Sequence, residues 1–200
     1  MKGSVIVVSF FIFGIFMGLH SFLPLWISRS NLSEYTLYLL MFLVGISVGG
    51  DRKTWKTLKE ANIKVFLVPL TVVIGSLVGT GIISFILEGV SLKEAMAVGS
   101  GFGYYSLSSI IITKFHGESL GVVALIANMT REILTLLISP FLAKYFGKLA
   151  PIASGGATSM DTTLSIIARS SGKDYVIISV FSGVVLTILV PFLVTFIISL

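Results

Sequence analysis

Two carboxylic acids lie inside apolar stretches of this 200-residue sequence, where an ionised side chain is costly if the stretch crosses a bilayer. Glu132 is close to the middle of residues 119–146, and Asn128, Thr135 and Ser139 fall on the same helical face. A carboxyl group at that depth is poised to bind and release a proton. We therefore expect Glu132 to couple protons or cations, with a structural contact to a basic residue as the alternative.

Arg131 directly precedes Glu132, but it points about 100° away around a helix, so the two side chains need not pair. Asn128 and Arg131 are both candidate substrate-binding residues. An acidic substrate would favour Arg131 over Glu132 as its partner.

Asp161 is the second acid, and it follows a pair of glycines at the start of a polar stretch. A carboxylate among hydroxyls and free backbone groups can hold an ammonium group or a proton, so we expect Asp161 to serve substrate binding and proton coupling. The alternative is a helix N-cap, for which Asp is well suited where a helix restarts. The hydroxyl residues that we expect beside it are Thr158 and Ser159, with Tyr104, Ser106 and Ser108 from an earlier polar segment.

The composition identifies the environment of these acids. Hydrophobic residues make up 55% of the chain and charged residues 12%, about half the charged share of a soluble domain. This balance excludes a soluble enzyme and indicates a polytopic membrane protein. The basic residues cluster at the ends of apolar runs, as in membrane topology, and not on a face that could bind nucleic acid. Cysteine is absent and no cluster of metal ligands occurs, so we expect neither a metal site nor a cofactor.

The chain divides into seven candidate segments, and two of them are too polar to resemble lipid-facing helices. We expect an all-α polytopic protein with about five full transmembrane helices and two broken or re-entrant segments. The glycine pairs 14/18, 45/49 and 75/79 are expected to serve helix packing. The five apolar segments are 4–27, 35–50, 65–87, 119–146 and 175–200, and the two polar segments are 95–113 and 152–168.

The Lys and Arg residues predict the orientation. Five of them fall between residues 52 and 64, which places that loop and the N-terminus in the cytoplasm and the C-terminus outside the cell. If the two polar segments dip into the membrane and return, the positive-inside rule is satisfied better by one residue than if all seven segments cross. We therefore expect two re-entrant segments.

The two polar segments resemble each other at an offset of 55 residues: each has a glycine, a short hydroxyl or acidic cluster, Ile-Ile, a basic residue and a second glycine. One crossing separates the copies, which predicts an inverted repeat around a midplane site. We expect a single transmembrane domain over 1–200, with three spans in 1–94 and repeat units in 95–146 and 152–200. The alternative is that Gly and Ser only let ordinary helices pack. The expected hinge glycines are Gly101, Gly103, Gly155 and Gly156.

An intramembrane protease would need a Ser/His dyad or two facing aspartates, and the only aspartate pair is Asp51 with Asp161. Asp51 lies in the basic cluster at a membrane boundary, so we predict that the chain is not an enzyme. A purely structural membrane subunit is a further alternative, but it would not need a carboxylate at the midplane.

Four strings resemble the lysine exporter family LysO: Phe-Leu-Val-Gly-Ile at 42–46, Ser-Gly-Phe-Gly-Tyr-Tyr-Ser-Leu-Ser at 100–108, Thr-Arg-Glu-Ile at 130–133 and Gly-Ala-Thr-Ser-Met-Asp at 156–161. The similarity runs from about residue 32 to the C-terminus. The resemblance implies export of L-lysine and its analogue thialysine across the inner membrane, in exchange for protons. It also implies a role for Glu132 as an essential membrane-embedded acid.

Full-length members of that family are about a third longer and carry extra N-terminal spans with another essential acid. The resemblance therefore implies a separately encoded membrane partner or a homo-oligomer. On this hypothesis the carboxylate of lysine binds backbone N–H groups at the broken segments, and its ammonium groups bind Asp161, hydroxyls and Glu132. The same scaffold carrying another amino acid or an organic ion is the alternative.

Overall fold

The computed structural model describes residues 63–200, together with seven isolated positions before them (13, 16, 17, 35, 39, 42 and 46). The predictions for spans 4–27 and 35–50, for the basic cluster up to residue 62 and for Asp51 lie outside the described residues. So do the glycine pairs 14/18 and 45/49.

Three long apolar helices carry the described part of the chain: α5 (Ile63–Ser84), α8 (Glu118–Tyr145) and α11 (Val176–Ser199). Each is long and apolar enough to cross a membrane, over Val65–Ser84, Glu118–Tyr145 and Lys173–Ser199. These ranges confirm the apolar helices expected at 65–87, 119–146 and 175–200. Large hydrophobic side chains cover the exposed faces of α5 and α8, as is normal for helices surrounded by lipid.

The two polar segments are broken helices, as their composition predicts. In the first, α6 (Leu92–Gly99) and α7 (Tyr105–His116) flank a non-helical turn. In the second, α9 (Ala150–Gly155) and α10 (Leu164–Ser171) flank the 3-10 turn η1 (Gly156–Met160). Left-handed backbone marks both breaks, at Phe102 (φ 47°), Gly103 (φ 92°) and Gly156 (φ 61°). We call the turns 100–104 and 156–163 the first and second tips.

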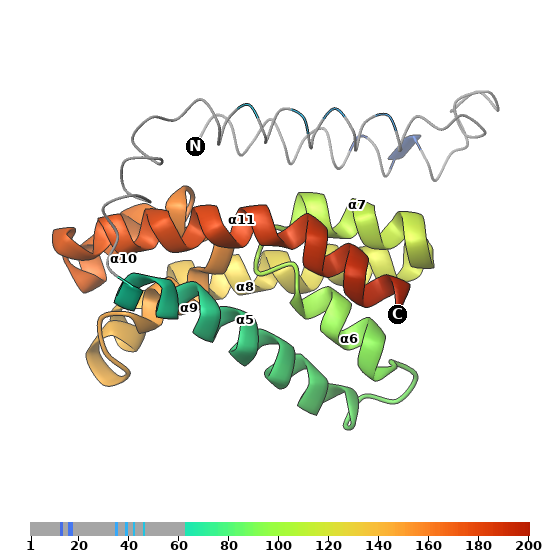
Figure 1. Ribbon diagram of the computed structural model, residues 1–200, viewed down its shortest axis with the longest axis horizontal. Coiled ribbons are helices and arrows are strands. Elements are labelled where there is room, and N and C mark those ends of the chain that lie inside the picture. The colour runs from blue at the N-terminus through green and yellow to red at the C-terminus, as the bar shows by residue number, and fades with distance from the viewer. Residues whose placement is uncertain are drawn as a thin grey trace. The chain divides into compact units, whose positions relative to one another are not determined.

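The broken helices form two hairpins that point toward each other (Figure 1): α6 and α7 lie toward the right of the view, and α9 and α10 toward the left. The tips touch, because the N–H of Ala157 donates to the carbonyl oxygen of Phe102 at 2.9 Å. Among residues 63–200, this is the arrangement that two segments dipping in from opposite sides would have. The number of crossings and the inverted repeat remain predictions.

The second halves of the two hairpins differ in length, with 12 residues in α7 and 8 in α10, but they end in the same way. Gly117 and Gly172 end α7 and α10 with φ of 99° and 109°. Each glycine N–H donates to the carbonyl four residues earlier, at Thr113 and at Ala168. The tips themselves differ, because the second contains a 3-10 turn and the first does not. The two helices thus end alike at an offset of 55 residues, whereas the repeat as a whole stays a prediction.

Helix α11 is the most buried of the three long helices, and it packs against both hairpins and α5. One side of it is buried in the bundle and the other is exposed and apolar, with Ile177, Phe192 and Phe196 more than 60% exposed. Phe181, Leu186, Val190 and Val194 are almost completely inaccessible. The second tip approaches α11 so closely that a Cβ atom on Gly183 would lie 2.6 Å from the Cβ atom of Met160.

Gly75 and Gly79 differ from expectation. We expected them to bring helices into close contact, but no atom of the described residues lies within 4 Å of a Cβ built on either one. Both line a cavity between α5, α6 and α8. The prediction that this pair brings helices into close contact is therefore wrong for the described part of the chain.

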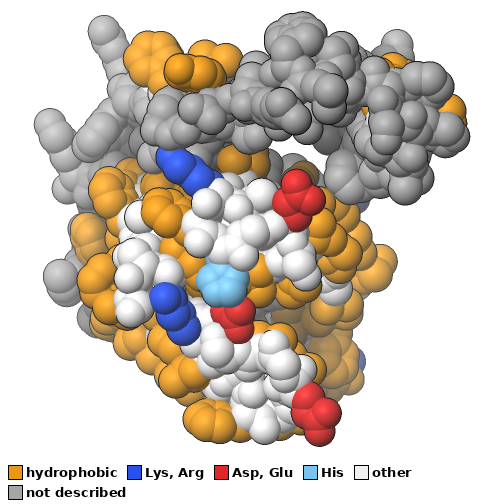
Figure 2. All heavy atoms as spheres, turned by 90° about the vertical axis from the view of Figure 1, so that its right-hand side faces the viewer, with side chains coloured by type: hydrophobic (Ala, Val, Ile, Leu, Met, Phe, Trp, Pro, Cys, Tyr) orange, Lys and Arg blue, Asp and Glu red, His pale blue; other side chains and the backbone are white. Residues whose placement is uncertain are grey.

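The right-hand end of the bundle carries polar and charged side chains with a border of hydrophobic ones (Figure 2). The loop between α5 and α6 and the junction between α7 and α8 are both at this end (Figure 1). The Nε2 atom of His116 lies 3.3 Å from a carboxylate oxygen of Glu94 there. This distribution is that of a membrane boundary, with charges grouped beyond the apolar part of the helices.

Candidate functional site

The first tip is held by one side chain of α8. Asn128 is 4% exposed, and its amide oxygen accepts a hydrogen bond from the N–H of Gly103 at 2.7 Å. Its amide nitrogen donates to the carbonyl of Val98 and to that of Ala124 in its own helix, each at 3.0 Å. Asn128 therefore supplies the acceptor of the Gly103 N–H, and it is a second donor to the Val98 carbonyl, which also accepts from the N–H of Gly101 at 3.2 Å. The tip fits tightly, because a Cβ atom on Gly101 would lie 2.6 Å from the amide nitrogen of Asn128.

The second tip is held by Arg131, one turn further along α8. Its Nε and Nη2 atoms donate to the carbonyls of Ser154 and Ala153 at 2.9 Å, at the end of α9. Its Nη1 atom donates to the hydroxyl of Ser76 on α5, also at 2.9 Å. A cation at a helix C-terminus interacts favourably with the carbonyl dipoles there. Arg131 thus joins α5, α8 and α9.

The polar stripe on α8 faces the interior of the bundle, as its spacing predicts. Thr135 and Ser139 are fully buried. The hydroxyl of Thr135 lies 2.7 Å from that of Ser154. The hydroxyl of Ser139 donates to the carbonyl of Thr135. These side chains bond to helices and to one another, which is a structural role.

The two acids come together on a neighbouring face of α8. Glu132 is partly buried and Asp161 is exposed at the second tip. Their charges act on each other, and the hydroxyl of Thr162 lies beside Glu132. The charge of Asp161 also acts on the phenols of Tyr104 and Tyr105. We call these five residues the acidic cluster: Glu132, Asp161, Thr162, Tyr104 and Tyr105.

No ion pair neutralises this cluster within residues 63–200. Arg131 does not pair with Glu132: its bonds all go to neutral groups. This agrees with the expectation that adjacent helix positions face apart. It gives no support among these residues to the alternative in which Glu132 only locks helices through a basic partner.

Asp161 is not the N-cap of a helix. Helix α10 begins after Thr163, and no side chain caps it. The carboxylate of Asp161 instead accepts from the N–H and, at 3.2 Å, the hydroxyl of the adjacent Thr162. The capping alternative is therefore wrong, and Asp161 keeps acceptor capacity for a ligand.

A small cavity of about 60 Å³ opens beside Asp161. Thr187 of α11 is 2% exposed and lines it, and its hydroxyl has no hydrogen-bond partner in the described structure. The sequence analysis missed Thr187, because one hydroxyl in a long apolar run carries no signal of its own. The lining residues are Tyr104, Ala157, Thr158, Met160, Asp161 and Thr187.

Several other predicted site residues have structural partners. The Ser159 hydroxyl donates to the carbonyl of Ser179, and that of Ser179 donates back to the carbonyl of Ser159. Ser108 is buried and donates to the carbonyl of Tyr104. Thr158 donates to the carbonyl of Gly155, although it also lines the small cavity. Ser106 is partly buried. These bonds shape the tips.

The glycines that we expected to act as hinges lie where the tips meet. A Cβ atom on Gly103 would lie 3.2 Å from the carbonyl oxygen of Gly155, and one on Gly156 would collide with the carbonyl oxygen of Phe102. Gly155 ends α9. Because Gly103 and Gly156 also have positive φ, only glycine fits both the conformation and the space.

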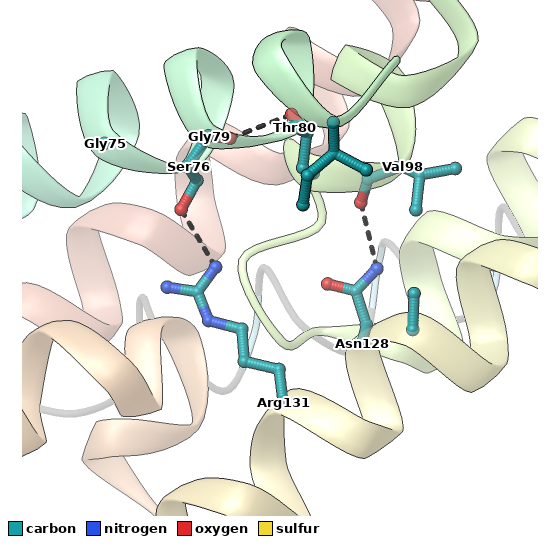
Figure 3. A pocket seen from close by; sticks show the side chains of 10 residues that line it. Gly75, Ser76, Gly79, Thr80, Val98, Asn128 and Arg131 are labelled. Atoms are coloured by element: carbon teal, nitrogen blue, oxygen red, sulfur yellow. Dashed lines mark hydrogen bonds between the residues drawn. The ribbon is translucent and has the colours of Figure 1, made fainter. Parts of the chain in front are cut away.

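A larger cavity of about 280 Å³ lies on the other side of the tips, between α5, α6 and α8 (Figure 3). Arg131 and Asn128 project from α8 toward Ser76 and Val98 across it (Figure 3). The lining residues are Gly75, Ser76, Gly79, Thr80, Ile83, Val98, Gly99, Ala127, Asn128 and Arg131. Within the described ranges, no group of three His, Cys, Asp or Glu residues could hold a metal ion.

Comparison with known proteins gives a consistent result. The family model described as Lysine exporter LysO matches residues 8–198. An Escherichia coli (strain K12) protein named Lysine exporter LysO is 39% identical over 164 residues, which are 82% of this chain and 54% of that protein. A Haemophilus influenzae relative is 34% identical over 174 residues, 86% of this chain and 87% of that protein. The chain thus spans about half the length of the E. coli relative. No solved structure matches it.

Proposed function

The chain belongs to the lysine exporter LysO family, and on that premise we propose that it exports L-lysine, and thialysine, across the cell's inner membrane in exchange for protons. The observation that carries this proposal is the meeting of Glu132 and Asp161 from two separate elements, without a basic partner among the described residues. Two ionised carboxylates that share a site without a bound cation repel each other, and binding a proton or an ammonium group removes this repulsion.

The proposed cycle uses this competition. An ammonium group of lysine arrives from the cytoplasm and binds the acidic cluster while Glu132 and Asp161 are both ionised. A proton arriving from outside neutralises one carboxylate, which weakens the attraction for the cation and releases it. The hairpins then move relative to the long helices to change the side from which the site is open. Gly103 and Gly156 support the proposal of a hinge at the tips, because other residues rarely adopt their backbone conformations.

The test is lysine movement in proteoliposomes under an imposed pH gradient. We expect the wild type to move lysine, and Asp161→Asn and Glu132→Gln to lose gradient-driven movement because each removes one charge of the pair. Glu118→Gln is the matched control, since Glu118 is exposed at the first turn of the same helix. Normal proton-driven movement by both variants in the acidic cluster would contradict the proposal.

We propose the orientation that the dipping topology implies, with the C-terminus outside the cell. His116 would then be outside and Lys148 inside. The hairpin of α6 and α7 supports this, because the α5–α6 loop and the α7–α8 junction lie at the same end of the bundle (Figure 1), as they would if this segment dips in and returns. Reporter tags inserted at these two loops should label from opposite sides of the membrane. Labelling of residue 116 from the cytoplasm would contradict it.

We also propose that the chain works with a second membrane unit, either another copy or a separately encoded partner. The support is that it covers only 54% of the E. coli relative. Reconstitution with and without the product of a neighbouring gene, combined with measurement of the mass of the purified particle, tests this. Transport by a monomeric particle alone would contradict it.

A further inference from the structure

The guanidinium of Arg131 is a cation without a matching anion in the described structure. A guanidinium has five N–H bonds. Three of them donate, to Ser154, Ala153 and Ser76, and all three acceptors are neutral oxygen atoms. One N–H on each terminal nitrogen is left over. Removing a charge from water without an anion is costly, and carbonyl dipoles offset only part of that cost.

The cavity beside this guanidinium has the properties of a small-ligand site. Its volume is about 280 Å³, and its wall is mainly apolar with a few convergent polar groups. Glycines keep it open, because no described atom lies within 4 Å of a Cβ built on Gly75 or Gly79. Figure 3 shows Arg131 and Asn128 reaching into it from α8, opposite Ser76 of α5.

From these contacts we infer that the Arg131 cavity is a carboxylate site that recognises the α-carboxylate of the transported amino acid, an inference that rests on the proposed function. The planar guanidinium matches a carboxylate in geometry, and its two remaining N–H bonds are the number that a bidentate pair uses. This differs from the sequence-based expectation that backbone N–H groups at the broken helices hold the carboxylate.

The site separates recognition of the two ends of the cargo. Arg131 and Glu132 are consecutive, so they face about 100° apart on α8, with the cationic cavity and the acidic cluster on different faces. The glycine tips lie between these faces, because a Cβ atom on Gly156 would lie 3.2 Å from Nη2 of Arg131. A solute is thus selected for carrying both a carboxylate and an ammonium group.

The experiment compares L-lysine with cadaverine, which is lysine without its carboxylate, as competitors for transport in proteoliposomes. We expect the wild type to prefer lysine by about tenfold to a hundredfold, the value of hydrogen bonds to a charged group. Arg131→Gln should bring the preference close to one by weakening lysine alone, and Arg131→Lys should restore part of it. An unchanged preference in Arg131→Gln, or an equal loss for both solutes, overturns the inference.

Arg131→Gln also removes bonds to α9, so a second variant tests the cavity without touching them. Gly79→Leu fills the cavity from α5, where the added side chain meets no described atom within 4 Å of its Cβ. Val78→Leu is the matched control, because Val78 is 55% exposed on the same helix. We expect Gly79→Leu to keep its melting temperature and lose lysine transport at least tenfold. Transport equal to that of the control overturns the inference.

Transport by the wild type distinguishes a failure of this inference from a failure of the proposed function. If it moves lysine and cadaverine equally well, export stands and the carboxylate site is overturned. If it moves neither solute, with or without its partner unit, both are overturned.

Discussion

Replacing Asn128 with leucine should remove the hydrogen bonds that hold the first tip against α8. The amide of Asn128 is the partner of the Gly103 N–H and the Val98 carbonyl, which lie 25 and 30 residues away in sequence. Leucine has nearly the same shape but no polar atom. The Gly103 N–H would then be left without a partner in a buried place. The Val98 carbonyl would keep the bond that it accepts from the N–H of Gly101 at 3.2 Å.

The expected cost follows from the Gly103 N–H. A buried backbone donor that loses its partner costs about 1–3 kcal/mol. The bonds from Asn128 to Val98 and Ala124 add little, because each carbonyl keeps a backbone N–H partner. A protein of this size loses about 2–4 °C of melting temperature per kcal/mol. We therefore expect a decrease of about 2–12 °C.

The assay is thermal unfolding of the purified protein in detergent, followed by loss of helical circular dichroism. Thr130→Leu is the matched control, because it introduces the same side chain at an exposed position of the same helix. If Asn128→Leu melts within about 1 °C of this control, Asn128 does not support the first tip and the reasoning is refuted.

Three further substitutions test other parts of the site. Gly156→Ala should lower the melting temperature far more than Gly75→Ala, because residue 156 has φ 61° and no space for a Cβ atom whereas residue 75 has open space. Thr187→Val should leave the melting temperature equal or higher, because it removes a buried hydroxyl without a described partner, and should weaken lysine transport if that hydroxyl contacts the cargo. Hydrogen bonds with Ser91 lower the pKa of the Glu94 carboxyl below its ordinary 4.5. They therefore stabilise the fold above pH 4.5, and this stabilisation is lost as the pH falls through the lowered pKa. The melting temperature of Glu94→Gln should depend less on pH than that of the wild type as the pH falls below 4.5.

The sequence could predict features that depend on local spacing. The 3.6-residue period of α8 places Asn128, Thr135 and Ser139 on one face, and all three are buried. Glycines among hydroxyl residues predict the two breaks, because such segments form poor helices and need protein around them in a membrane. The three long apolar helices follow from run length alone.

The rest depends on contacts between distant elements, which spacing does not encode. The bond between Ala157 and Phe102 joins tips that are 55 residues apart. Arg131 holds the end of α9 and also lines a cavity, and neither role can be read from a motif. The same holds for Gly75 and Gly79: close packing and an open cavity both require small residues, and only the neighbours of α5 distinguish between them.

The adjacency of Arg131 and Glu132 combines these observations. If the two side chains paired, each would neutralise the other and neither could attract a charged solute. The helix instead turns them to different faces, and the carbonyls at the end of α9 hold the guanidinium away from the carboxylate. Neutral carbonyls orient a cation without cancelling its charge, so the field of Arg131 remains available in its cavity. On the proposed function, this is the property that a carrier of amino acids needs: opposite charges on adjacent residues of one helix that do not bind each other.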